Sequence, residues 1–455
     1  MNSLKKIFFI IASSFLVLLF VFIFSADFLK DYYEKNKKNR KNFNEYNFFK
    51  KSLIVIAEFN DNLKNISFSS RGILFVNNTA KSKHKNKQRF KRYIKSDSSD
   101  LLLQPRFDFY DKAVIELIDT NNFNVLHSYR HDFNYVDSLI NHDSVSFKNM
   151  RRDNHPDRFE YWNAHIDDDA SIYTFGYRQY PLIKFDLCGK IIWIKDTSRT
   201  HHSIQESLDE KLWLTTSLYP YSKIINNHKQ EYGFNDHAIE KIDKETGKTV
   251  FLKSISEILV ENNVLPIYDL LRTNDPIHLN KVEEAKHDTK FYKKGDLFLS
   301  LRNLDAILHF RPANNKVINY IKGPFYRQHD VDILDEKIII FNNNNSIKKD
   351  SKYSQILIYD LETKEFSTLM NDSFVKYNIK TVTAGLQHVL SDKSVVVWES
   401  NHARILKFNK NGKLEFQYVN KSSNGVISNI GWGRVIEDKN KIISLKEKIN
   451  ENKCN

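Results

Sequence analysis

Short apolar strands recur along this chain in pairs, and a polar turn joins the two members of each pair. In "LIKFDLCGKIIWIK" (182–195), for example, Asp, Gly and Lys residues separate two runs of β-branched and aromatic residues. This arrangement is typical of a β-hairpin. The pattern occurs in six segments: 113–129, 182–195, 238–253, 306–321, 355–369 and 404–419.

Each hairpin belongs with two further strand-like segments, one from a nearer group and one from an outer group. The nearer segments are 72–78, 171–177, 211–217, 296–302, 337–343 and 394–400. The outer set, often containing histidine, comprises 163–169, 201–207, 278–284, 328–334, 384–390 and 431–437. The repeat therefore has four strands and occurs about six times, with hairpin starts 49 to 69 residues apart.

Four-stranded sheets that repeat around an axis form a β-propeller, in which the strand edges are protected between neighbouring blades. The sequence predicts an all-β, six-bladed β-propeller preceded by an N-terminal transmembrane helix. Segment 431–437 comes last and should pair with the N-terminal strands of the first blade, which closes the ring. Seven blades remain the alternative, because "KIISL" (441–445) could add another strand.

Composition supports a β-rich core and narrows the choice of partners. Hydrophobic residues make up 41% of the chain and aromatic residues 13%, with Phe and Tyr prominent, which favours β-structure. The net charge of +13 comes with Lys throughout the chain, but no basic helix or RNA-binding motif accompanies it, so no nucleic-acid partner is predicted. Cys188 and Cys454 match no disulfide framework or zinc-site spacing.

The N-terminal region predicts a membrane anchor. Residues 7–24 are uncharged and reach the lower length limit of a membrane-spanning helix, about 17–25 residues. The stretch is longer than the apolar region of a typical signal peptide, and no good cleavage site follows it. An uncleaved signal anchor is therefore favoured over a cleaved signal peptide. The predicted organisation is an anchor (1–29), a basic juxtamembrane linker (30–69), the propeller (70–445) and a C-terminal tail (446–455).

The histidines of the repeat suggest a shared site. In a propeller the first strand of each blade lines the central channel, so side chains at matching repeat positions converge. A lone histidine there would usually bond the backbone, but clustered titratable groups in a concave site suggest function. The candidates are His202, His278, His329, Asn280 and Arg302.

These residue types suit an oxyanion better than a metal ion. Arg offers a planar fork for oxygen atoms, and neutral imidazole can act as a nucleophile or a base. A zinc or copper site was the other possibility, but the arginine and the missing CxxC and HExxH spacings argue against it, so no metal and no cofactor are predicted. A sulfate or phosphate ester fits this set.

At the same positions the chain resembles the bacterial arylsulfate sulfotransferase family, whose fold is a six-bladed propeller. The resemblance covers residues from about 160 to 437. It rests on five runs: "HHSI" (201–204), "DPIHLNKV" (275–282), "LSLRNLDAI" (299–307), "GPFYRQHD" (323–330) and "TAGLQHVLSDKSVVVW" (383–398).

The resemblance implies a two-step transfer without a nucleotide sulfate donor. The histidine matching His329 would attack the sulfur of an aryl sulfate ester, and the sulfohistidine would pass its sulfuryl group to a phenolic acceptor. His202, His278 and Arg302 match the other catalytic positions. Asn280, Thr383 and His201 are expected to bind substrate or line the channel, with His201 the more structural of the two adjacent histidines.

The family also implies a location and an assembly. Its members act in the periplasm, so the resemblance predicts a single-pass protein of the bacterial inner membrane with a periplasmic propeller and a possible homodimer. The positive-inside rule opposes this, because six basic residues in 30–41 follow the anchor and only Lys5 and Lys6 precede it. A large downstream domain, however, translocates largely regardless of charge.

The chain departs from the family in three features. Little of the chain is left for the separate N-terminal β-domain of characterised members, a closely spaced cysteine pair is absent, and segment 219–235 diverges. Two other functions therefore remain open. The protein could be a membrane-tethered, non-enzymatic propeller that binds a partner, since fold does not decide function, or a hydrolase that gives the group to water.

Overall fold

The computed structural model describes residues 84, 86–95, 100–110, 112–141, 143–144, 146–147, 150, 159–176, 180–228, 233–345, 351–423, 425–451 and 454, together with Ser14. The chain divides into two units, Met1–Phe75 and Val76–Asn455. Apart from Ser14, every described residue belongs to the second unit.

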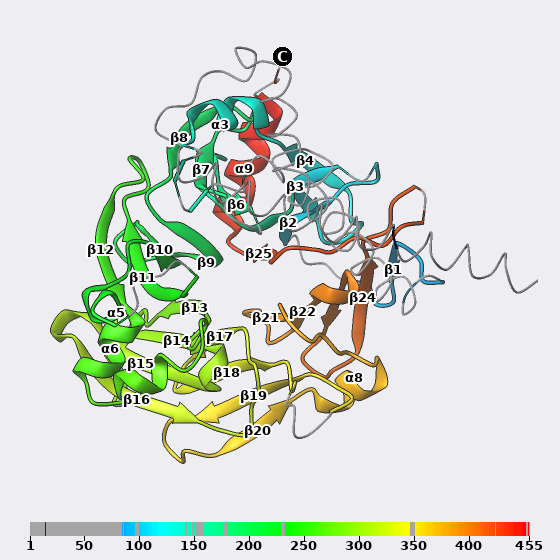
Figure 1. Ribbon diagram of the computed structural model, residues 1–455. Coiled ribbons are helices and arrows are strands. Elements are labelled where there is room, and N and C mark those ends of the chain that lie inside the picture. Colours follow the sequence, from blue (N-terminus) through cyan, green and yellow to red (C-terminus); the bar gives the residue numbers. More distant parts are fainter. Residues whose placement is uncertain are drawn as a thin grey trace, which may run out of the picture. The chain divides into compact units, whose positions relative to one another are not determined.

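The second unit is built from six antiparallel sheets arranged around a centre, as Figure 1 shows. The first three sheets are, in order of hydrogen-bonded neighbours, β25 (Arg434–Ile436), β2 (Leu101–Phe107), β3 (Ala113–Asp119), β4 (Val125–Tyr129); β5 (Tyr161–Ile166), β6 (Ile172–Gly176), β7 (Leu182–Phe185), β8 (Ile191–Lys195); and β9 (Arg199–Glu206), β10 (Leu212–Leu218), β11 (Asp236–Ile242), β12 (Thr249–Ser254).

The other three sheets repeat the same order. They are β13 (Leu279–Glu284), β14 (Leu297–Leu301), β15 (Ala306–Arg311), β16 (Lys316–Lys322); β17 (Val331–Leu334), β18 (Lys337–Asn342), β19 (Gln355–Asp360), β20 (Phe366–Leu369); and β21 (Leu386–Val389), β22 (Val395–Glu399), β23 (Arg404–Phe408), β24 (Leu414–Val419), with β1 (Phe90–Arg92) added beside β24. The six-bladed propeller and all six predicted hairpins are confirmed.

The ring closes as predicted, because the last strand completes the first blade. β25 pairs antiparallel with β2, with Leu101 opposite Ile436 and Leu103 opposite Arg434. Figure 1 places β9, β13, β17, β21 and β25 around the centre, with β12, β16 and β20 on the outside. The histidine-bearing first strands therefore surround the axis.

The hydrophobic core lies between neighbouring blades. Phe175 of β6 and Leu214 of β10, from adjacent sheets, belong to one cluster of fully buried side chains. Such burial contributes roughly 25 cal/mol per Å² of apolar surface removed from water. Because each sheet packs against its neighbours, the core holds the inner strands in place around the axis.

The first blade differs from the prediction in one strand. The sequence pattern assigned 72–78 to the position before the hairpin β3–β4, but that position is occupied by β2, the segment "LLLQPRF". Segment 72–78 itself lies outside the described residues. β2 contains a proline and a glutamine, Pro105 and Gln104, which obscure its strand pattern.

Short helices fill some of the connections. They are α3 (Phe133–Leu139), α5 (Lys223–Asn226), α6 (Ile255–Glu261), α7 (Ile267–Leu270) and α8 (Asn371–Lys376), with 3₁₀ turns η3 (Arg302–Leu304), η4 (Pro312–Asn314) and η5 (Ser400–His402). Residues 439–451 form helix α9 (Lys439–Glu451), so 441–445 adds no strand and no seventh blade.

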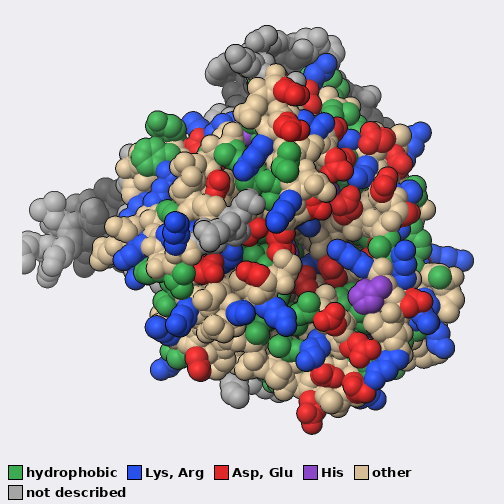
Figure 2. All heavy atoms as spheres, turned by 180° about the vertical axis from the view of Figure 1, so that it is seen from behind, with side chains coloured by type: hydrophobic (Ala, Val, Ile, Leu, Met, Phe, Trp, Pro, Cys, Tyr) green, Lys and Arg blue, Asp and Glu red, His purple; other side chains and the backbone are tan. Residues whose placement is uncertain are grey.

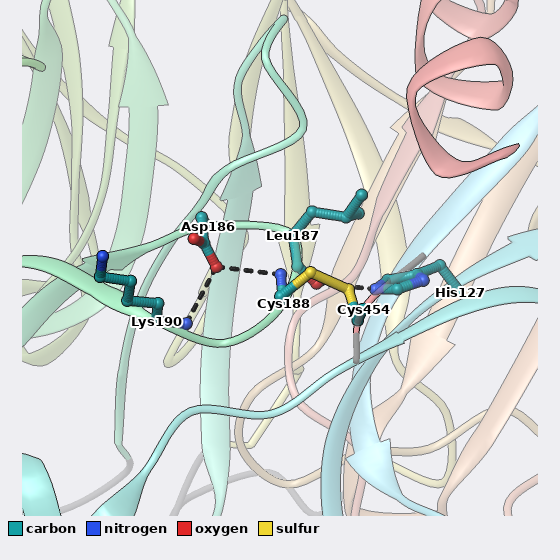
Figure 3. Close-up of a disulfide and its surroundings, with 6 residues drawn as sticks. All are labelled: His127, Asp186, Leu187, Cys188, Lys190 and Cys454. Carbon is teal, nitrogen blue, oxygen red and sulfur yellow. Dashed lines mark hydrogen bonds between the residues drawn. A yellow bond between two sulfur atoms is a disulfide. The ribbon is translucent and has the colours of Figure 1, made fainter. Parts of the chain in front are cut away.

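A disulfide ties the C-terminal end of the chain to the second sheet. Cys454 is bonded to Cys188, which lies in the turn between β7 and β8, across 266 residues of sequence (Figure 3). Next to it, the ring of His127 on β4 contacts the carbonyl of Leu187 at 2.9 Å. The two cysteines match no framework in the sequence because their pairing depends on contacts that only the closed ring creates.

No helix in the described part of the chain is long and apolar enough to cross a membrane. The anchor predicted at 7–24 lies outside the described residues, except for Ser14.

Candidate functional site

Three of the histidines predicted for the site lie close together, on or just before three inner strands. His202 lies within β9, His278 directly precedes β13, and His329 lies two residues before β17. The ring centres of His202 and His278 are 5.1 Å apart, and those of His202 and His329 are 6.0 Å apart. The predicted convergence on one site is therefore observed, while the catalytic roles remain predictions.

The backbone is unusual at two of these histidines. His202 and His278 have φ angles of 61° and 52°, which place non-glycine residues in the sparsely populated left-handed region. Residues 201–203 oppose only Thr215 in the ladder between β9 and β10, and Asn280 is the extra residue between β13 and β14. Such bulges re-aim side chains and are frequent beside active sites.

Asparagine side chains connect the inner strands of neighbouring blades. Asn163 donates from Nδ2 to the carbonyl of His202 at 3.0 Å, and Asn280 donates to the carbonyl of Gln328 at 3.1 Å. These bonds hold the backbone beside two of the histidines. Asn280 was predicted to bind substrate. Its amide nitrogen is used in this brace, and its Oδ1 is buried without a hydrogen-bond partner among the described residues.

Hydrogen bonds decide which nitrogen of His329 carries its proton. Nδ1 lies 2.7 Å from Oδ1 of Asn343 and 3.1 Å from the carbonyl oxygen of Arg327, both of which are acceptors. Asn343 is oriented by its own Nδ2, which donates to the carbonyl of Thr381. Neutral His329 therefore keeps its hydrogen on Nδ1 and has a lone pair on Nε2.

The surroundings of His329 keep it neutral. Burial lowers its pKa well below the ordinary 6.5, and the nearby charges of Arg302 and His278 lower the pKa further. The hydrogen bonds with Asn343 and Arg327 act in the opposite direction but do not reverse the shift. A neutral, partly desolvated imidazole is the form that can attack an electrophile.

Two guanidinium groups lie beside the histidines and share one acceptor. Arg302 donates from Nη1 to Oδ1 of Asn303 at 2.8 Å, and Arg327 donates to the same oxygen. The backbone amide of Arg302 also donates to the carbonyl of His278. Arg327 was not predicted as a site residue, although it lies in the run "GPFYRQHD". Paired arginine forks suit the oxygens of an anion.

Sequence reasoning also missed His237 and Asp275. His201 connects His202 to His237, and Asp275 contacts both His237 and His278. Ligand atoms of His237, Asp275 and His278 lie within 4.8 Å of one another, so this trio could hold a metal ion. His237 lies at the start of β11, the third strand of its blade, where the repeat pattern does not identify it as a channel residue.

Thr383 lies on the segment that precedes β21. Its hydroxyl exchanges hydrogen bonds with the side-chain amide of Asn401, and its backbone nitrogen donates to the same side chain. The neighbouring Thr381 is the residue whose carbonyl orients Asn343. Thr383 is thus connected to His329 through the backbone of its own segment and Asn343.

A cavity of about 580 Å³ lies along the inner strands. Its lining extends from Asn163 and Ser203, beside His202, to Glu206 and Glu284 at the far ends of β9 and β13. Trp432 lines this cavity, and its ring centre is 5.8 Å from that of His202. Figure 2 shows a hollow near the middle of one face with acidic side chains around it.

Comparison with known proteins gives one family match. The family model described as arylsulfotransferase (ASST) matches residues 166–421, more than half of the chain. No curated protein matches the chain.

Several solved structures are similar in shape. A protein of unknown function from Bacteroides caccae has 10% identity and a TM-score of 0.46, covering 75% of this chain and all of its own. A streptogramin B lyase has 10% identity and a TM-score of 0.38, covering 77% of this chain and 97% of its own. Virginiamycin B lyase from Staphylococcus aureus has 13% identity and a TM-score of 0.32, covering 56% and 69%. These TM-scores are low, and nothing further about this chain follows from them.

Proposed function

The chain belongs to the arylsulfotransferase family, and from this premise we propose that it moves a sulfuryl group from an aryl sulfate ester to a phenolic acceptor through a sulfohistidine at His329. The observation that supports this most is the state of His329: its hydrogen is held on Nδ1 by Asn343, and its Nε2 lone pair is free to attack. The ring also lies within 6.0 Å of His202.

The first half-reaction would load the enzyme. His329 Nε2 forms a bond to sulfur, the bond between sulfur and the aryl oxygen breaks, and the electron pair leaves with the phenolate. Negative charge spreads over the sulfuryl oxygens as the transition state forms. Arg302 and Arg327 offer fixed donors for that charge, and preorganised donors of this kind are usually the largest contribution to catalysis.

The second half-reaction would unload it. The acceptor oxygen forms a bond to sulfur, the bond between sulfur and Nε2 breaks, and its electron pair returns to His329. The acceptor must lose its proton during this step, so a nearby base accelerates it. The ring of His202 lies 6.0 Å from that of His329, and the ring of His278 lies 5.1 Å from that of His202, so these imidazoles are candidates for the base. Because the donor already carries an activated sulfuryl group, the sequence of steps uses no cofactor.

We further propose that the propeller works in the periplasm and that residues 7–24 anchor it in the inner membrane. The disulfide between Cys188 and Cys454 supports an oxidising compartment, because disulfides are rare in the reducing cytosol of mesophiles. A reporter fused to the C-terminus should be active only outside the cytoplasm. Activity confined to the cytoplasm would refute this topology.

One assay separates the candidate activities. Purified protein is incubated with 4-nitrophenyl sulfate or 4-methylumbelliferyl sulfate, with and without added phenol, and release of the coloured or fluorescent product is followed. Release that depends on phenol, with phenyl sulfate as product, supports transfer. Release without an acceptor indicates a hydrolase, and no release indicates a binding protein with an inactive channel.

A further inference from the structure

A chain of hydrogen bonds runs from the histidine site to a partly exposed carboxylate. Nδ1 of His202 is 2.8 Å from Nδ1 of His201, and Nε2 of His201 is 2.8 Å from Nδ1 of His237. Nε2 of His237 is in turn 2.9 Å from Oδ1 of Asp275. The Asp275 side chain is 30% exposed and that of His237 is 4% exposed, so the chain leads from inside the propeller toward solvent.

The charge state of the chain follows from its hydrogen bonds. Each of the two contacts between imidazole nitrogens holds one hydrogen, and so does the contact between Nε2 of His237 and Oδ1 of Asp275. Three hydrogens shared by three rings give one hydrogen per ring, and an aspartate carboxyl is ionised at neutral pH. The resting chain therefore consists of three neutral imidazoles ending in one carboxylate.

This charge state decides every tautomer. An ionised carboxylate only accepts, so His237 carries its single hydrogen on Nε2 and accepts at Nδ1. His201 must then donate from Nε2 and accept at Nδ1. His202 must donate from Nδ1, which leaves a lone pair on its Nε2. The carboxylate of Asp275 thus makes His202 a base through two intervening rings.

We propose that His201, His237 and Asp275 form a proton relay that keeps His202 in its basic tautomer and exchanges the proton of the phenol with solvent. The proposal rests on the proposed function and assigns a task to two residues, His237 and Asp275, that contact neither His329 nor its hydrogen-bond partners. They are positioning residues, since they act through His202.

The relay balances in both half-reactions. When the acceptor attacks, its proton goes to Nε2 of His202, the Nδ1 proton of His202 moves to His201, and the Nε2 proton of His201 moves to His237. The Nε2 proton of His237 passes to Asp275, which releases it to water.

This transfer leaves the hydrogens on Nε2 of His202 and on Nδ1 of His201 and His237. In the next first half-reaction each proton moves back by one position. Nε2 of His202 protonates the departing phenolate, and Asp275 passes a proton from water to Nε2 of His237, which restores the starting tautomers. An enzyme that starts in the basic tautomer releases its first phenol as the phenolate, and the full cycle consumes no net proton.

The relay matters most for weakly acidic phenols. A phenol with a pKa near that of tyrosine, about 10, is protonated at neutral pH and needs a base. A more acidic phenol depends less on a base. Loss of the relay should therefore slow transfer more steeply as the acceptor pKa rises, whereas a purely structural defect slows transfer to all acceptors equally.

The test uses the full chain with His237→Phe, which interrupts the relay and leaves the contact between Asp275 and His278 in place. The enzyme is loaded with 4-nitrophenyl sulfate, whose leaving group needs little proton transfer, and the loaded enzyme is mixed with phenols from 4-cyanophenol to 4-methoxyphenol. The initial burst of 4-nitrophenol should be preserved. Transfer should fall by roughly 10²-fold for the least acidic phenols and much less for 4-cyanophenol.

Asp296→Asn is the matched control. Asp296 also forms a buried contact with a histidine, since its Oδ2 lies 2.8 Å from Nε2 of His309, but this pair lies away from the site. It should lower stability without changing the dependence on acceptor pKa. An equal loss for all phenols with His237→Phe, or no loss, would overturn the relay. So would a tightly bound divalent metal whose removal by EDTA abolishes transfer, since the metal would occupy the atoms that hold the protons. A wild-type protein without any burst contradicts the proposed function instead.

Discussion

At the scale of single residues, the surroundings of His329 predict an unusual pH profile. An unperturbed imidazole becomes protonated near pH 6.5, whereas burial and then the charges of Arg302 and His278 lower the pKa of His329 well below that value. The neutral, attacking form therefore persists into mildly acidic solution. The burst rate with 4-nitrophenyl sulfate should stay constant from pH 7.5 to below 6.5 and fall only at lower pH. A midpoint at or above 6.5 would contradict the burial of this ring.

Asn343 provides a second prediction at this scale. Asn343→Leu removes the nearer of the two acceptors for the Nδ1 hydrogen and leaves only the carbonyl of Arg327 at 3.1 Å, so the hydrogen moves more readily to Nε2 and blocks attack. The burst rate should fall on the order of 10²-fold. Asn343→Asp keeps an acceptor and adds a negative charge, which raises the pKa of His329.

The aspartate variant should therefore keep a burst but move its acid midpoint to higher pH. Both variants lose the bond to the carbonyl of Thr381, so each serves as the control for the other. Equal effects of the two would show that Asn343 acts only through packing.

The sequence could single out His202, His278 and His329 because they lie on or just before the first strands of successive repeats, and Arg302 because it ends the predicted strand that follows one of them. It could not identify His237, Asp275, Asn343 or Arg327 in the same way. His237 lies on the third strand of its blade, Asn343 directly follows β18, and the other two lie on connections, where no periodic pattern marks them. Their roles depend on hydrogen bonds across strands and blades, such as the 2.8 Å contact between His201 and His237.

At the scale of elements, local pattern explains what could be predicted. All six hairpins follow from alternating apolar residues and turn chemistry, which act within a few residues. The strand β1 and the disulfide could not be predicted, because each depends on partners distant in sequence. Helix α6 does carry a local signal, the N-cap Ser254 followed by Glu257 three residues later, which the strand pattern left unused. Cys188 and Cys454, for example, become neighbours only after β25 has joined β2 and α9 has packed on the adjoining blades.

The disulfide gives a prediction at this scale. It closes a loop of 266 residues, and removing such a link typically costs about 2–4 kcal/mol, largely by freeing the unfolded chain. The double variant Cys188→Ser, Cys454→Ser should unfold at lower denaturant concentration than the oxidised wild type. Reducing agent should lower the wild-type midpoint to the same value and leave the variant unchanged. A wild-type midpoint that does not respond to reduction would show that the link contributes nothing.

At the scale of the whole molecule, buried histidines make the fold sensitive to acid. Burial lowers the pKa of eight of the described histidines: His131, His165, His201, His202, His237, His309, His329 and His388. In the unfolded chain each would take up a proton near pH 6.5. The unfolded state therefore binds more protons than the folded state below that pH, and acid favours unfolding.

A few buried carboxyls act in the opposite direction. Burial raises the pKa of Asp330, Glu283 and Glu257, so these groups hold protons in the folded state that the unfolded chain has released. The histidines outnumber them. The free energy of unfolding should decrease as pH falls from 7 to 5.5, with each histidine contributing at most about 1.4 kcal/mol per pH unit. Urea titrations at several pH values measure this. Unchanged or greater stability at pH 5.5 would be inconsistent with eight neutral buried rings.

The ring as a whole was predictable because closure follows from repetition. Six four-stranded units protect one another's edges only when the last meets the first, and β25 completes the first sheet in this way. The membrane anchor, its orientation and the assembly of copies, including the expected dimer, remain predictions.

The most direct test of the account is the chemical identity of the loaded enzyme. The protein is exposed briefly to 4-nitrophenyl sulfate, quenched at alkaline pH, digested and examined by mass spectrometry, with His329→Ala as the control. The account predicts one sulfuryl group on the peptide containing His329, its disappearance when phenol is added before the quench, and no label on the variant. A label on another residue, or undiminished turnover by His329→Ala, would contradict it.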